Sequence, residues 1–187
     1  MLLKKSFDYF KTFKIFTEIL NNIFKLSVDN KDYNKQYITF LANKNELIDN
    51  LKNDFITPIE RGDIFILSDM FSREMNHINV LNDYSSFSWS ELNEVKNSLH
   101  QLLVVQCNVF DKIAFEKVNV NIVDKANNGY NQSQRLVRDI YKLIKKTIVG
   151  YCENPLLKYA VYVAYLELAK QLNTTFFENE RIILNNS

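Results

Sequence analysis

Apolar residues recur every three to four positions along most of the chain, which is the spacing of one face of an α-helix. In the first segment Phe7, Phe10 and Phe13 begin such a face, and lysines occupy other positions around the helix. The pattern breaks at short polar stretches and at the two prolines, because the residue before a proline disfavours helix. This spacing predicts six helices, over residues 3–26, 31–53, 58–82, 88–116, 123–149 and 155–183, the fourth with a capped start at Ser88 or Ser90.

The predicted helix ends rest on capping residues. Pro58 suits the first turn of the third helix, and Glu60 suits the positive end of that helix's dipole. Gly150 suits the C-cap of the fifth helix. At the other end of this helix, residues 119–122 are β-branched and brief and predict a connector or a short extension, while Asn-Asn-Gly at 127–129 favours a kink or a delayed start.

The six predicted helices form two sets of three, separated by a polar turn at residues 84–88. We therefore expect one all-α domain over residues 1–187, an antiparallel helical bundle with two three-helix halves at roughly 1–83 and 84–187. The residue-level similarity of the halves is too weak to demonstrate a duplication.

The scarcity of turn-forming residues excludes several other fold classes. Gly and Pro together make up 5 of the 187 residues, whereas average usage is about 12% for the pair. Sandwiches and barrels need tight turns at frequent spacing. No two glycines lie close enough for a phosphate-binding loop or a dinucleotide fingerprint. Composition therefore supports the all-helical prediction.

Charge and hydropathy indicate which partners and which cellular location to expect. The chain has 23 Lys and Arg against 22 Asp and Glu, interspersed along the sequence, so we expect no nucleic-acid binding. No apolar run approaches the roughly 20 residues that a membrane span needs. Residues 1–24 lack the pattern of a signal peptide. We therefore expect a cytoplasmic protein.

The aromatic stripe of Phe7, Phe10, Phe13 and Phe16 has two interpretations. Aromatic residues at helical spacing are most often core, and we favour that interpretation. The flanking lysines leave a membrane-surface helix as the alternative.

Nucleophilic catalysis has few candidate residues. Cys107 and Cys152 form no Cys-x-x-Cys pair and are expected to be inert thiols in a reducing cytoplasm, with a disulfide between them as the alternative. The two histidines, His77 and His100, lie on different predicted helices, which disfavours a Cys-His dyad. We expect a protein that is not an enzyme.

One sequence feature suggests a metal site. Glu74 and His77 form a Glu-x-x-His motif, which places both side chains on one helix face as di-iron bundles require. Such sites need a second pair, but His100 has Asn97 three positions earlier. The favoured interpretation is a solvated Glu74 and a half-exposed His77, with residual iron or zinc at these two residues as the alternative.

Residues 55–64 read Phe-Ile-Thr-Pro-Ile-Glu-Arg-Gly-Asp-Ile. This segment, the signature loop, resembles the helix-to-helix turn of the PhoU-like phosphate transport regulators, which reads Phe-Ile-Thr-Pro-Phe-Asp-Arg-Glu-Asp-Ile. Gly62 is the clear departure. Charged residues here can tie the turn to a neighbouring helix. The matching positions that we take as site residues are Phe55, Thr57, Pro58, Glu60, Arg61 and Asp63.

The resemblance implies an all-α fold of two three-helix bundles and a role as a regulator or accessory protein of inorganic phosphate transporters. It implies contact with a phosphate transporter or another membrane-associated protein, at the inner face of the membrane. We also expect a homo-oligomer such as a dimer.

Many members of that family hold metal clusters with Glu/Asp-x-x-x-Asp motifs, and this chain lacks most of them. The equivalent positions carry Thr39-Phe40-Leu41, Ser72-Arg73, Gln132-Ser133-Gln134 and Lys170. The resemblance therefore indicates a divergent member without a cofactor, in which Glu74 and His77 are the only residual metal candidates.

Overall fold

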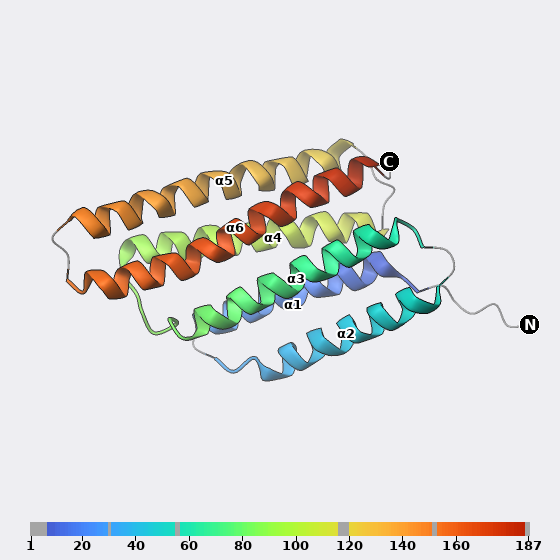
Figure 1. The fold of residues 1–187 in the computed structure, drawn as a ribbon, viewed down its shortest axis with the longest axis horizontal. Helices are drawn as coiled ribbons and strands as arrows, with labels where there is room; N and C mark the ends of the chain where they lie inside the picture. Colours follow the sequence, from blue (N-terminus) through green and yellow to red (C-terminus); the bar gives the residue numbers. More distant parts are fainter. Residues whose placement is uncertain (1–6, 30, 55–56, 116–119, 151–152, 186–187) are drawn as a thin grey trace, which may run out of the picture.

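The computed structural model describes residues 7–29, 31–54, 57–115, 120–150 and 153–185. Within these residues the chain is all-helical, and its helices run along one long axis as an antiparallel bundle (Figure 1). This confirms the predicted fold class. The described helices are α1 (Tyr9–Val28), α2 (Asn34–Asn53), α3 (Arg61–Asn82), α4 (Ser90–Phe115), α5 (Val120–Val149) and α6 (Pro155–Asn185).

Four helices form the centre of the bundle, and two lie outside them. α1 packs against α3 and α4, and α6 packs against α3 and α4. α5 covers α4 and α6 on one side, while α2 packs against α1 on the other (Figure 1). The α1–α4 and α3–α6 contacts join residues of both predicted halves into one continuous core.

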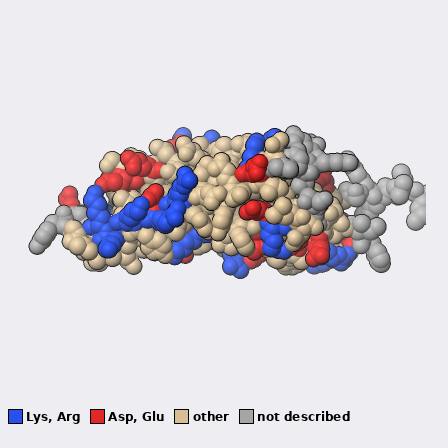
Figure 2. Space-filling model, turned by 90° about the horizontal axis from the view of Figure 1, so that it is seen from above, with Lys and Arg blue, Asp and Glu red and all other residues tan. Residues whose placement is uncertain are grey.

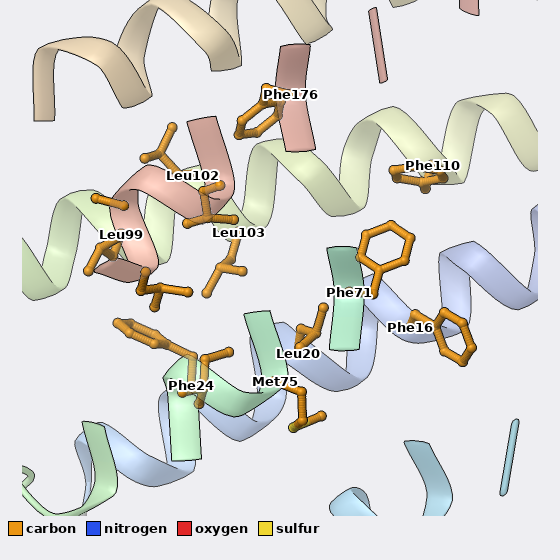
Figure 3. Close-up of a cluster of buried hydrophobic side chains, with 14 of the residues drawn as sticks. Phe16, Leu20, Phe24, Phe71, Met75, Leu99, Leu102, Leu103, Phe110 and Phe176 are labelled. Atoms are coloured by element: carbon orange, nitrogen blue, oxygen red, sulfur yellow. The ribbon is translucent and has the colours of Figure 1, made fainter. Parts of the chain in front are cut away.

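Aromatic side chains fill the middle of this core. Phe13, Phe16, Phe71 and Phe110 are fully or almost fully buried, and their rings lie 5.3 to 6.3 Å apart. Figure 3 shows that Phe16, Phe71 and Phe110 come from three different helices. Each buried phenylalanine contributes about 1.5–3 kcal/mol through the hydrophobic effect. The aromatic stripe of α1 is therefore core at Phe13 and Phe16, as the favoured interpretation predicted.

Several of the described helix starts differ from the predictions by a few residues, whereas α6 begins at Pro155 as predicted. α1 begins at Tyr9, where the Asp8 carboxylate accepts a hydrogen bond of 3.0 Å from the Lys11 amide, a typical N-cap. α3 begins at Arg61 rather than at Pro58, so Pro58 lies in the turn before the helix and not in its first turn. Glu60 occupies the N-cap position without a side-chain capping bond.

α5 is longer at its start than predicted. Residues 120–122 are already helical instead of forming a connector, and residue 119 lies outside the described residues. The helix continues through 127–129 without delay. A β-carbon at Gly129 would lie 2.4 Å from the Phe176 ring, so this glycine permits close contact of α5 with α6. The predicted end of α5 at Val149 is confirmed.

Candidate functional site

The signature loop leads from the end of α2 into α3. The Thr57 hydroxyl donates a hydrogen bond to the Ile59 carbonyl at 2.6 Å. The Arg61 guanidinium donates to the Asp54 carbonyl at the end of α2. Phe55 lies outside the described residues. Gly62 faces open space, so the position where the family has Glu has room for a side chain.

The start of α1 is also attached to this turn. The Tyr9 hydroxyl donates a hydrogen bond of 2.8 Å to the Asp54 carboxylate. Burial, together with this carboxylate, raises the pKa of Tyr9 well above its usual value, so the phenol keeps its proton. Asp54 therefore links α1 and α2 at the point where the chain enters the signature loop.

An ion pair connects the signature loop to the far end of the chain. Arg181 Nη2 on α6 lies 2.9 Å from Asp63 Oδ1, and the Asp63 side chain is only 8% exposed. The same guanidinium contacts Glu178 Oε2 at 2.6 Å. A charge-assisted hydrogen bond to a buried carboxylate is stronger than a neutral one. The predicted tie between this turn and a neighbouring helix is therefore present at Asp63.

Glu74 lies in the core of the bundle, so the expectation of a solvated side chain is wrong. It is 0% exposed, on the α3 face that packs against α1 and α6. Both carboxylate oxygens are within hydrogen-bond distance of the Gln106 amide nitrogen on α4, at 3.0 and 3.2 Å. Burial raises the pKa of Glu74 to about 7, against the opposing effect of hydrogen bonds from Thr175 and Gln106.

Neutral groups surround the Glu74 carboxyl in the part of the chain that the structure describes. Gln106 and Thr175 are its hydrogen-bond partners, and no cation is among the causes of its pKa shift. The carbonyl oxygen of Gln106 is buried and has no partner among the described residues. A protonated carboxyl can donate one hydrogen bond, so the site can hold a neutral acid beside an amide.

His77, the second residue of the Glu-x-x-His motif, lies on α3 one turn after Glu74. It is half-buried on α3, as expected, and burial lowers its pKa while the nearby Glu167 of α6 opposes that effect. Among the described residues no three His, Cys, Asp or Glu side chains are grouped closely enough to hold a metal ion. Metal centres in proteins generally use three or four side-chain ligands. Glu74 and His77 would thus need donors from elsewhere.

Cys107 is a free thiol whose Sγ donates a hydrogen bond of 3.1 Å to the Thr17 carbonyl of α1. Burial raises its pKa to about 11. Because the thiolate is the reactive form, this environment makes Cys107 a poor nucleophile at neutral pH. Cys152 lies outside the described residues.

The positions that replace the family's acidic motifs are mostly satisfied by local contacts. The Thr39 and Ser72 hydroxyls donate to carbonyls four residues earlier on their own helices. Ser133 is buried and accepts a hydrogen bond of 2.9 Å from Asn173 on α6. Lys170 pairs with Glu167 at 2.8 Å. The Ser133 contact joins α5 to α6, and the other three lie within a single helix, so these positions carry polar or basic groups in place of the family's carboxylates.

Two side chains that contact the candidate site residues, Gln106 and Arg181, were not predicted from the sequence. Gln106 lies on the apolar stripe of α4, seven residues after Leu99 and four before Phe110, and a polar residue at a core position was the available signal. Arg181 carries no local signal, because its partner Asp63 is 118 residues away.

Comparison with known proteins adds no relative: no family model and no curated protein matches this chain. The resemblance to the PhoU-like family therefore rests on the signature loop and on the order of the helices.

Proposed function

We propose that this chain is a PhoU-like, non-enzymatic regulator or accessory protein of inorganic phosphate transport. It acts by contact with a phosphate transporter or another membrane-associated protein at the inner face of the membrane. The observation that carries the proposal is the signature loop, whose Arg61 and Asp63 make the contacts to α2 and α6 that such a turn requires. Six helices in the expected order support it.

Three exposed apolar side chains on α2 and α3 are candidates for contact with a protein partner. Ile38 on α2 is 65% exposed, and Phe65 and Val80 on α3 are 57% and 48% exposed. Exposed apolar side chains that gather in one patch often mark an interaction site. These residues are therefore the first to test for contact with the transporter or with a second copy of the chain.

Phosphate uptake by cells that lack the protein tests the proposal. Deletion should change the rate of labelled phosphate uptake, and the wild-type chain should restore it. Phe65→Ser should restore it less well than Phe177→Ser, a control at a phenylalanine that is 50% exposed on α6. Unchanged uptake on deletion, with no transporter recovered by pulldown from native membranes, would overturn the proposal.

A metal-binding bundle of the same fold is the second candidate, because buried carboxylates are usually paired or metal-bound. Glu74 is such a carboxylate, and His77 follows it on α3. Elemental analysis of the purified protein decides this. Stoichiometric iron or zinc that is lost in Glu74→Gln would favour the second candidate, and substoichiometric metal would remove it.

A further inference from the structure

The end of the bundle where α5 meets α6 carries a concentration of positive charge. Residues 135–159 include six basic residues and two acidic ones, a net charge of +4. Since the whole chain has a net charge of +1, the remaining residues sum to −3. Figure 2 shows Lys and Arg gathered at one end of the face that α5 forms. Basic and acidic residues are thus interspersed over the chain as a whole, but basic residues are in excess at the end where α5 meets α6.

The basic residues of α5 lie on one face of the helix. Arg135, Arg138, Lys142 and Lys145 follow one another at spacings of three and four, and all four are exposed. We call these four residues the basic stripe. Lys142 pairs with Asp139 at 2.7 Å, while the other three make no ion pair among the described residues. With Asp139 included, the stripe therefore carries a net charge of +3 along about 15 Å of helix.

Aliphatic side chains continue from the basic stripe at the same end. Val149, four residues after Lys145, is 77% exposed, and its neighbour Ile148 is 66% exposed. Leu156, in the first turn of α6, is 83% exposed. We call these three residues the apolar tip. Exposed aliphatic side chains at the same end of a bundle as lysines are typical of a surface that enters the headgroup region of a bilayer.

We propose that the basic stripe and the apolar tip together bind an anionic lipid bilayer, with the stripe on the headgroup phosphates and the tip between the headgroups. An acidic protein or a nucleic acid would pair with the basic stripe but would leave the aliphatic side chains of the apolar tip in water. The proposal rests on the proposed location beside the membrane, and it adds the surface and the chemistry of its ligand.

Sedimentation of the full chain with vesicles tests this surface. The wild type should bind vesicles of 70% phosphatidylcholine and 30% phosphatidylserine, a composition chosen as roughly that of an anionic leaflet. It should bind pure phosphatidylcholine weakly, and binding should fall as salt rises. Each removed charge should lower the partition coefficient by about fivefold. The stripe variant is Arg135→Gln/Arg138→Gln/Lys145→Gln, and the tip variant is Ile148→Ser/Val149→Ser/Leu156→Ser.

Two control variants make the test specific. Lys11→Gln/Lys35→Gln/Lys52→Gln removes the same charge from exposed sites on α1 and α2. Leu41→Ser/Phe177→Ser removes exposed apolar side chains from α2 and α6. Both controls should bind like the wild type, and circular dichroism melting should show that every variant is folded.

Three results would overturn the proposal: no wild-type binding to the anionic vesicles, equal weakening by both charge variants, or full binding by the tip variant. Full binding by the tip variant, together with binding to DNA or to an acidic peptide, would identify the stripe as a site for those polyanions. The vesicles contain no transporter. Failure here therefore leaves the uptake test standing, and unchanged uptake beside vesicle binding would remove only the transport role.

Discussion

Replacing Glu74 by glutamine removes the ionisable group from the core while keeping its shape. Glu74 is 0% exposed, and its carboxyl contacts the Gln106 amide and Thr175, which are both neutral. Burial of a carboxyl disfavours its charged form, and the pKa of Glu74 rises to about 7. A glutamine at this position would carry no charge at any pH and could donate to the unpartnered Gln106 oxygen.

The sign of the effect on stability follows from proton binding. Near pH 4 and below, Glu74 is protonated in both the folded and the unfolded chain. Between about pH 4.5 and pH 7 the unfolded chain loses this proton while the folded chain keeps it, so the free energy of unfolding falls as pH rises. A pKa raised from 4.5 to about 7 corresponds to a loss of about 3 kcal/mol, complete above pH 7.

Urea unfolding of the wild type and of Glu74→Gln from pH 4 to pH 8.5 measures this loss. The free energy of unfolding of the variant, relative to that of the wild type, should increase by about 3 kcal/mol between the two ends of the range. Glu94→Gln, at an exposed glutamate on α4, should show no such change and serves as the control. A difference that is constant with pH would refute the reasoning, because Glu74 would then titrate alike in both states.

Three further changes test other contacts of the fold. Gly129→Ala places a methyl group 2.4 Å from the Phe176 ring and should lower the free energy of unfolding by about 1–3 kcal/mol in urea unfolding; an unchanged value would mean that the ring moves aside freely. Arg181→Ala leaves the buried Asp63 carboxylate without its cation and should cost about 1–3 kcal/mol, with Arg181→Lys restoring part of it; equal stability of all three proteins would contradict a contribution from this ion pair. Cys107, with a pKa of about 11, should react slowly with iodoacetamide at pH 8 in the folded protein, as peptide mapping by mass spectrometry would show; labelling as fast as in urea would contradict its burial.

The helices and the core could be predicted from the sequence, because the spacing of apolar residues is a local property of the chain. The helix face that this spacing defines is the face that is buried. Phe13 and Phe16 lie on the predicted face of α1 and are fully buried. The start of α3 was not predicted correctly, because the side-chain contacts of the turn before it leave no sign in the hydrophobic spacing. The hydrogen bond from Arg61 to the Asp54 carbonyl and the ion pair between Asp63 and Arg181 hold the turn outside the helix.

The burial of Glu74 could have been predicted in part. Leu67, Phe71, Ile78 and Leu81 are buried at spacings of four, seven and three, and Glu74 occupies the place halfway between Phe71 and Ile78. Met75, four residues after Phe71, is buried on this face as well. Because α3 packs against both α1 and α6, its buried face is wide enough for both residues. The hydrogen bond between Glu74 and Gln106 across the core could not be predicted from the sequence.

The protonation state of Glu74 separates the two candidate functions. A carboxyl must lose its proton to ligate a metal ion, so metal binding to this residue would strengthen as pH rises. If Glu74 is instead a neutral acid beside Gln106, the free energy of unfolding falls as pH rises from 4.5 to 7. Urea unfolding at pH 8 with and without a chelator therefore distinguishes them. Destabilisation by the chelator in the wild type but not in Glu74→Gln would support the metal-binding bundle, and equal stability with and without the chelator would support the neutral acid.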